Sequence, residues 1–219
     1  MAAQQNSTER TPGRGLFITF EGTDGAGKST QAHLLAEHLR ATGNAVTQTR
    51  EPGGAPGAED IRRLLVEGDP GRWSAETEML LFTAARRDHV ERTVIPALSR
   101  GEIVLCDRFV DSTRAYQGDG ALREKVDALH RLMIGIEADL TLIFDIDAGA
   151  GLARTAVRTG SEDRFEQRGA VFQQALRQRF QALTREFPER CVLIDADREV
   201  AEIAADVRRV VQSRLDMRG

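Results

Sequence analysis

A glycine-rich stretch near the N-terminus carries the residue types that bind phosphate. The segment 21–30 reads EGTDGAGKST and follows the apolar run 16–20, LFITF. Its spacing, Gly-x4-Gly-Lys-Ser, fits the P-loop pattern, in which backbone N–H groups between a strand and a helix surround the phosphates of a nucleotide. We therefore expect nucleoside triphosphate binding by this loop, whose residues are Gly22, Thr23, Asp24, Gly25, Ala26, Gly27, Lys28, Ser29 and Thr30.

Three side chains of the loop have chemistry of their own. Lys28 stands where a P-loop lysine reaches the β- and γ-phosphates, and the hydroxyl of Ser29 stands where Mg²⁺ is bound. Asp24 is less expected, because a carboxylate within an anion-binding loop repels phosphate. One interpretation is that Asp24 only caps the loop.

A second pair of candidates follows the apolar run 103–106, IVLC. Asp107 comes at the carboxyl end of this predicted strand, where ligands bind in parallel sheets, and it suits a role in ordering Mg²⁺ through water. Arg108 offers a planar guanidinium group that can hold a phosphate through two hydrogen bonds. Taken alone, the pair could also be an ion pair at the surface.

Two further segments carry groups suited to reading a base and a sugar. Phe82 and Arg86 stand four residues apart on one helix face, so a ring could stack on a base while an arginine donates to a base carbonyl. Packing of Phe82 in the core is the alternative. The segment 111–120 adds hydroxyl and amide groups, or else is a polar loop with capping residues; its candidates are Ser112, Thr113, Tyr116 and Gln117.

The P-loop indicates a nucleoside triphosphate but not the reaction. A GTPase needs an Asn-Lys-x-Asp motif to read its base, and the two asparagines of the chain, Asn6 and Asn44, are not followed by lysine. A kinase needs a second, anionic pocket and a cover that keeps water out. The candidates above supply the pocket, and the arginine-rich segment 154–168 supplies a cover. The sequence therefore favours phosphoryl transfer.

The elements that must position these residues alternate along the chain. Apolar runs with little alternation predict strands covered on both faces, at 16–20, 45–49, 103–106, 140–145 and 191–194. Apolar residues spaced by about 3.6 positions predict helices after the P-loop, at 57–67, 122–136 and 168–186, and from Ile203 to Val211. Strands separated by helices predict an α/β fold with a parallel sheet and helices on both faces.

The composition is that of an ordinary globular protein. The 219 residues are 41% hydrophobic and 29% charged, and the formal net charge of −4 argues against a nucleic-acid partner. No apolar run is long enough to span a membrane, so no membrane partner is expected. Residues 1–14 are polar and lack the features of a signal peptide, so we expect a flexible extension there. We expect residues 15–219 to form a single domain. Cys106 and Cys191 lie in apolar runs, which predicts buried, reduced thiols and a cytoplasmic location.

The motifs together resemble those of one family. FEGTDGAGKSTQ, TREPGG, LLFTAAR, CDRF followed by DS and AYQG, and EDRFE are similar in order and spacing to the motifs of bacterial thymidylate kinases, from about Leu16 to Leu215. The resemblance implies a P-loop kinase fold with a five-stranded parallel sheet, an arginine-rich lid and a homodimer. It also implies transfer of the γ-phosphoryl group of ATP to dTMP, with Mg²⁺, to give dTDP and ADP.

Carried over residue by residue, the resemblance implies an acceptor site. Phe82 stacks on thymine, and Arg86 donates to its O4 carbonyl. Arg108, with Arg50 of REPGG beside it, holds the dTMP phosphate. Thr113 lies by the base, and Tyr116 and Gln117 lie by the sugar. Ser112 completes the acceptor site.

The resemblance also implies roles for Asp24 and for the lid. The acidic residue at the position of Asp24 reaches the acceptor nucleotide, near its 3′-hydroxyl. Bacterial members have no arginine inside the P-loop and supply a transition-state arginine from the lid. The P-loop of this chain also lacks an arginine. The lid at about 154–168 offers Arg154, Arg158 and Arg164, of which Arg158 is the favoured one.

Two alternative functions stay open. The first is a kinase of another pyrimidine monophosphate such as dUMP, because Phe82 and Arg86 do not determine a preference for the 5-methyl group. The second is a P-loop ATPase that works without an acceptor. The number of arginines around a second pocket argues against the ATPase.

Overall fold

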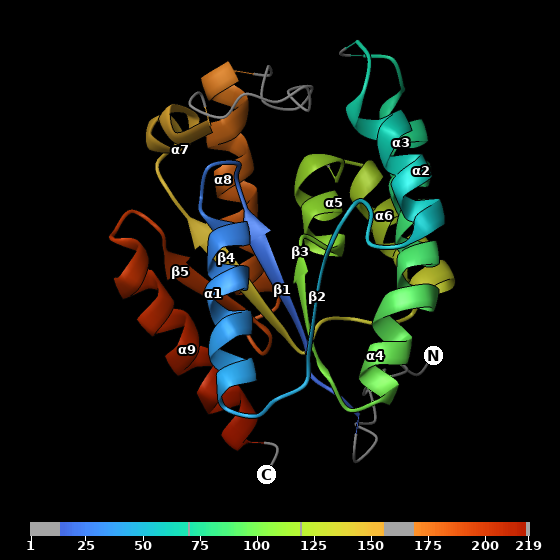
Figure 1. Ribbon diagram of the computed structural model, residues 1–219. Helices are drawn as coiled ribbons and strands as arrows, with labels where there is room; N and C mark the ends of the chain where they lie inside the picture. The colour runs from blue at the N-terminus through green and yellow to red at the C-terminus, as the bar shows by residue number, and fades with distance from the viewer. Residues whose placement is uncertain (1–13, 70, 119, 156–168, 218–219) are drawn as a thin grey trace, which may run out of the picture.

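Five parallel strands form the central sheet (Figure 1). The computed structural model describes residues 14–69, 71–118, 120–155 and 169–217. The strands are β1 (Phe17–Gly22), β2 (Val46–Arg50), β3 (Ile103–Asp107), β4 (Leu140–Asp145) and β5 (Cys191–Asp195). Their order across the sheet is β2-β3-β1-β4-β5, and every neighbouring pair is parallel. The predicted α/β fold with a five-stranded parallel sheet is therefore confirmed.

Helices connect the strands, and five of them fall where the 3.6-residue spacing predicted helices. The helices are α1 (Lys28–Ala41), α2 (Pro56–Val66), α3 (Ala75–His89), α4 (Ile95–Ser99), α5 (Val110–Tyr116), α6 (Leu122–Leu129), α7 (Ala148–Thr155), α8 (Gly169–Glu186) and α9 (Val200–Asp216). Short π-helical segments join α3 to α4 (η1, Val90–Val94) and extend α6 (η2, His130–Ile134). One helix, α5, falls where the sequence allowed a polar loop.

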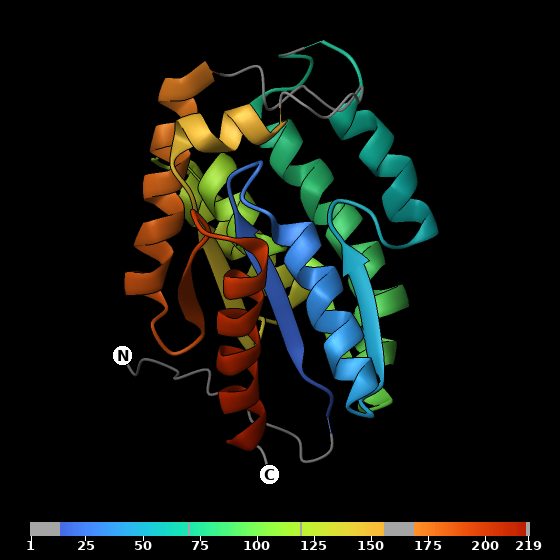
Figure 2. The same ribbon diagram turned by 60° about the vertical axis from the view of Figure 1, so that its left-hand side comes forward.

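The sheet is covered on both faces. Helices α1 and α9 pack side by side on one face, and α3 to α6 and α8 lie on the other (Figures 1 and 2). Successive residues of β1 point to opposite faces, so Ile18 packs against α1 and α9 while Phe17 packs on the other side. Burial on both faces is why β1 is apolar without alternation.

Other expectations from the sequence concern the cysteines and the chain ends. Cys106 and Cys191 are both buried and free, as predicted. Within the described ranges, no helix has the length and apolar character needed to cross a bilayer. Residues 1–13 and 156–168, which include most of the predicted extension and lid, lie outside the described part of the chain.

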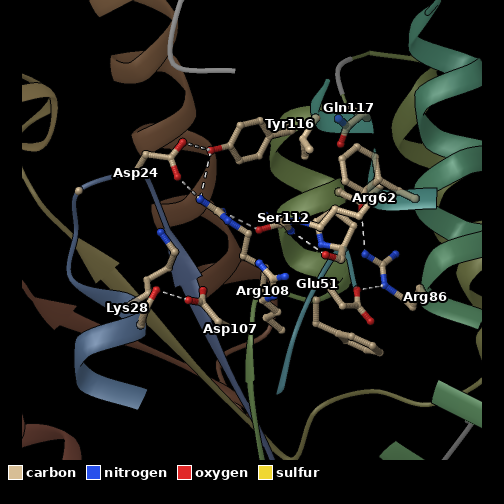
Figure 3. A pocket seen from close by; sticks show the side chains of 18 of the residues that line it. Asp24, Lys28, Glu51, Arg62, Arg86, Asp107, Arg108, Ser112, Tyr116 and Gln117 are labelled. Atoms are coloured by element: carbon tan, nitrogen blue, oxygen red, sulfur yellow. Dashed lines mark hydrogen bonds and ion pairs between the residues drawn. The ribbon is translucent and has the colours of Figure 1, made fainter. Parts of the chain in front are cut away.

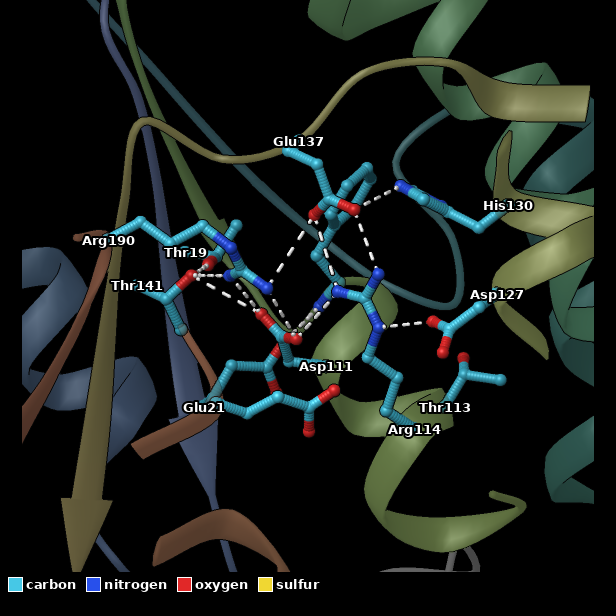
Figure 4. Close-up of polar contacts among 12 residues, drawn as sticks. Thr19, Glu21, Asp111, Thr113, Arg114, Asp127, His130, Glu137, Thr141 and Arg190 are labelled. Atoms are coloured by element: carbon cyan, nitrogen blue, oxygen red, sulfur yellow. Dashed lines mark hydrogen bonds and ion pairs between the residues drawn. The ribbon is translucent and has the colours of Figure 1, made fainter. Parts of the chain in front are cut away.

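A buried ionic network ties α5 to the sheet (Figure 4). Arg190 donates to the two carboxylate oxygens of Asp111 at 2.6 and 3.0 Å and to Thr141 Oγ1 at 2.9 Å. Arg114 donates to Asp111 Oδ1 at 2.9 Å and to Glu137 Oε1 at 2.8 Å. Burial disfavours the charged form of Asp111, but the hydrogen bond and charge of Arg190 hold its pKa below the ordinary value. The network fixes the helix that carries several of the candidate site residues.

Removal of Arg190 tests this anchoring. Arg190→Met leaves the Asp111 carboxylate buried with only Arg114 as its charged partner, so we expect the free energy of unfolding to fall by about 3 kcal/mol. Urea denaturation measures it. The control is Arg209→Met, because Arg209 is 73% exposed and pairs with Asp206 at the surface, where a loss below about 0.5 kcal/mol is expected. Equal losses in the two variants would contradict the anchoring role.

Candidate active site

A cavity of about 350 Å³ opens at the carboxyl ends of β1, β2 and β3 (Figure 3). The P-loop forms one wall, and α3 and α5 form the opposite one. Most of the site residues predicted from the sequence line this cavity, namely Asp24, Gly25, Gly27, Lys28, Ser29, Arg50, Phe82, Arg86, Asp107, Arg108, Ser112, Thr113, Tyr116 and Gln117. Segments far apart in the chain therefore meet in one place, although their roles toward a ligand stay predictions.

The P-loop has a backbone that only glycine fits at key positions. Gly22 and Gly25 have φ values of 131° and 78°, and a Cβ on Gly25 would lie 2.2 Å from the carbonyl oxygen of Gly151. Lys28 is the first residue of α1, and its Nζ donates to the carbonyl oxygen of Thr23 at 2.8 Å across the loop. Burial, and then the positive charge of Arg108, lower the pKa of Lys28 to about 8.

Ser29, at the start of α1, and Asp107, at the end of β3, contact each other in the wall of the cavity. Ser29 Oγ donates to Asp107 Oδ2 at 2.5 Å. A hydroxyl and a carboxylate supply the oxygen ligands that Mg²⁺ prefers, so this pair fits such an ion. Across the described ranges, no cluster of three or more His, Cys, Asp or Glu side chains could hold a metal. An ion here would therefore take its other ligands from water or from a bound molecule.

Asp24 forms an ion pair with Arg108. The Arg108 Nη2 atom lies 2.5 Å from Asp24 Oδ1, and the Tyr116 hydroxyl donates to Asp24 Oδ2 at 3.1 Å. Burial disfavours the Asp24 charge, but Arg108 and then Lys28 hold its pKa below the ordinary value. These bonds join Asp24 to Arg108 and to Tyr116 of α5.

Arg108 itself has an unusual backbone. Its φ of +70° is in the left-handed region, which non-glycine residues rarely adopt. Its Nη1 donates to Ser112 Oγ at 2.9 Å and to the carbonyl oxygen of Gly22 at 3.2 Å. The guanidinium group therefore lies between the P-loop and α5, at the centre of the cavity (Figure 3).

Glu21 is a buried carboxylate behind Arg108 that the sequence analysis did not select. It accepts hydrogen bonds from the backbone N–H of Phe109 at 2.7 Å and from Ser112 Oγ at 2.6 Å. Burial, and then the nearby Asp111 carboxylate, raise the pKa of Glu21 to about 8. The available signal was an acidic residue near the end of a fully buried strand, where a charge needs partners.

Arg86 is fixed by a second carboxylate that the sequence analysis also missed. Arg86 Nε donates to Glu51 Oε2 at 2.7 Å, and its Nη2 donates to Thr113 Oγ1 at 2.9 Å. Glu51 also contacts His89 Nδ1 at 2.9 Å. Phe82, one turn before Arg86 on α3, is half-buried and lines the cavity. A flat ring and an oriented guanidinium group thus share one wall, as the spacing indicated.

The remaining candidates occupy the rim and a second hollow. Arg50 is half exposed at the end of β2 and pairs with Glu59 at 3.3 Å. On the other side of the P-loop, a hollow of about 170 Å³ is lined by residues that include Ala26, Thr30 and Arg154. Thr23 is buried within the loop. Arg158 and Arg164 lie outside the described residues, so only Arg154 of the predicted lid arginines can be placed.

Comparisons with known proteins identify a family for this chain. The family model described as thymidylate kinase matches residues 20–207. A thymidylate kinase from Ruegeria pomeroyi is 61% identical over 206 residues, which cover 93% of this chain and 98% of that protein. One from Caulobacter vibrioides is 51% identical over 207 residues, covering 93% and 99%. The crystal structure of thymidylate kinase from Ehrlichia chaffeensis superimposes with a TM-score of 0.73 at 35% identity, covering 91% of this chain and 99% of that one. The chain therefore belongs to the thymidylate kinase family.

Proposed function

We propose that this protein transfers the γ-phosphoryl group of ATP to dTMP, giving dTDP and ADP. Family membership supports this reaction. The observation that carries it is the single cavity in which the P-loop faces Arg108, Arg86 and Phe82. A P-loop enzyme that only hydrolysed its nucleotide would have no need for this second, arginine-lined wall.

The acceptor half of the cavity suits a pyrimidine nucleoside monophosphate. Phe82 offers a ring on which the base stacks, and Arg86, oriented by Glu51, donates to a base carbonyl. Arg108, with Arg50 at the rim, binds the acceptor phosphate. Near the base and sugar, the polar groups of α5 complete the site; these are Ser112, Thr113, Tyr116 and Gln117.

The donor half is the P-loop with the hollow behind it. Backbone N–H groups and the N-terminus of α1 bind the ATP phosphates, and Lys28 leaves the carbonyl oxygen of Thr23 to bind the terminal ones. The hollow lined by Arg154 and Thr30 receives the rest of the donor nucleotide. Ser29 and Asp107, which contact each other in the free site, would hold Mg²⁺. When bound, that ion neutralises charge on the transferring phosphoryl group.

The chemical step needs positioning more than a strong base. A phosphate oxygen of dTMP attacks the γ-phosphorus, and the bond to the bridging β,γ-oxygen breaks, so that ADP leaves with the electron pair. Asp24 accepts a hydrogen bond on the acceptor side, near the 3′-hydroxyl. Arg158 supplies the transition-state arginine from the lid, with Arg154 and Arg164 as the alternatives. The largest loss of kcat among the three single alanine variants assigns that role.

The acceptor requirement tests the proposed function. In the presence of Mg²⁺, we expect ADP release from ATP to rise by orders of magnitude on addition of dTMP. A coupled assay measures it, with dUMP, other nucleoside monophosphates and no acceptor as parallel samples. The same rate with and without every acceptor would indicate an ATPase. A higher kcat/KM for another pyrimidine monophosphate would reassign the substrate.

Lys28 makes donor binding depend on pH. Its pKa of about 8 in the free site means that the amine is charged below this pH and neutral above it. ATP phosphates favour the charged form, so ATP binding at about pH 9 should take up a proton, and binding at about pH 7 should take up almost none. Calorimetry in buffers of different ionisation enthalpy measures the uptake.

The chain offers a matched control for that experiment. Its other lysine, Lys125, is half exposed and pairs with Glu76 away from the cavity. Proton uptake should vanish in Lys28→Met and persist in Lys125→Met. Uptake that persists in Lys28→Met would assign the proton to another group.

A homodimer is the proposed assembly. Four large apolar side chains on α3, α4 and η2 are exposed, by 42% to 75%; they are Leu80, Ile95, Leu132 and Met133. Arg87, on α3 between Leu80 and Ile95, donates to the carbonyl oxygen of Met133 at 2.7 Å, which brings the elements together. Exposed apolar groups that lie close together favour contact with another chain.

The molar mass in solution tests the dimer. Light scattering should give twice the chain mass, and Leu132→Glu should lower it because a charge enters the apolar contact. Val171→Glu, at a residue that is 87% exposed on α8, is the control. A native monomer would exclude the dimer.

The predicted cytoplasmic location stays a prediction that cell fractionation would check.

A further inference from the structure

The backbone at Arg108 needs support from its surroundings. A non-glycine residue in the left-handed region is strained, and it persists only where neighbouring contacts hold it. The backbone N–H of Arg108 donates to the carbonyl oxygen of Phe20 at 2.9 Å, which continues the pairing of β3 with β1. This bond fixes the chain on entry to Arg108, but another contact must fix the chain that leaves it.

Glu21 supplies that contact from the adjacent strand. One carboxylate oxygen accepts the N–H of Phe109, the residue directly after Arg108. The other oxygen accepts the hydroxyl proton of Ser112. Since the Ser112 proton is directed to Glu21, the lone pairs of Ser112 Oγ are free to accept Arg108 Nη1 at 2.9 Å. Glu21 therefore reaches Arg108 by two routes, through the backbone and through the guanidinium group.

We propose that Glu21 is the positioning residue for Arg108: it fixes the left-handed turn and orients the Ser112 hydroxyl, so that the guanidinium group faces the acceptor phosphate. The proposal rests on the proposed function, in which Arg108 binds that phosphate. Glu21 does not touch the substrate. It acts from behind, because it is fully buried and is not among the residues that line the cavity.

Asp24 cannot perform this task. Its side chain is 28% exposed and lines the cavity, so it binds the Arg108 edge that a phosphate would also use. An arriving phosphate would compete with Asp24 for the guanidinium group of Arg108. Glu21 contacts Ser112 and the Phe109 N–H outside the cavity, so its hydrogen bonds stay in place when the phosphate binds. The two carboxylates thus differ in function although both lie near one guanidinium group.

Comparison of dTMP with thymidine isolates the effect, because thymidine lacks the phosphate that Arg108 binds. Calorimetry at about pH 9 keeps the Glu21 carboxylate ionised and acceptor-only. We expect Glu21→Gln to weaken dTMP binding by about tenfold and thymidine binding by less than about twofold. The amide group preserves the side-chain volume, but its nitrogen is a donor and cannot accept the Phe109 or Ser112 proton.

Two further variants separate positioning from a general structural effect. Glu102→Gln makes the same chemical change at the opposite end of β3, where Glu102 contacts Arg100 and Thr47 and none of the three lines the cavity, so the ratio of the dTMP and thymidine affinities should stay at the native value. In an Arg108→Ala background, Glu21→Gln should cause no further loss of dTMP affinity. Thermal unfolding of each variant shows that it is folded.

Each outcome has one meaning. A selective loss of dTMP affinity that disappears in the Arg108→Ala background supports the proposal. Equal losses for both ligands, no loss for either, or a full additional loss in that background would overturn it. If the native protein binds neither ligand, the proposed function fails as well. If native protein binds dTMP and Glu21→Gln binds it equally well, only this inference fails.

Discussion

The guanidinium group of Arg108 is the point at which the two halves of the cavity are joined. It contacts the P-loop through Asp24 and the Gly22 carbonyl, and α5 through Ser112. A cation in this place makes a carboxylate inside a phosphate-binding loop tolerable, because Asp24 is paired before any anion arrives. Burial would otherwise favour loss of the Asp24 charge, yet its pKa is held below the ordinary value. The site therefore holds buried charged groups of opposite sign in contact with one another, as Asp24 and Arg108 are.

Much of this arrangement could be predicted from local sequence. The P-loop depends on glycines, because they adopt backbone conformations that few other residues adopt. The positions of these glycines can be read directly from the sequence. Strands buried on both faces appear as apolar runs, and the order of strand and helix determines a parallel sheet. Asp107 and Arg108 could be placed at the cavity because the carboxyl ends of parallel strands meet at one edge.

Other parts depend on contacts between distant segments and have no local signal. Helix α5 escaped prediction because its buried positions are largely polar, and its burial is offset by Arg190, which lies 79 residues away. The roles of Glu21 and Glu51 follow from what lies opposite them in space, at Ser112 and at Arg86. A pattern of hydrophobic residues carries no information about such pairs. These pairs are determined by hydrogen bonds between segments that are distant in the sequence and meet at the carboxyl ends of the strands.

The internal bond of Lys28 affects how readily the empty loop can receive a ligand. A lysine loses roughly 1.5–2 kcal/mol of rotamer freedom when it is immobilised, and here that entropy is given up during folding, not on binding. An arriving phosphate oxygen then replaces the Thr23 carbonyl as acceptor for an ammonium group that is already nearby. The loop is thus preorganised, and more of the intrinsic attraction between nucleotide and protein remains as measured affinity.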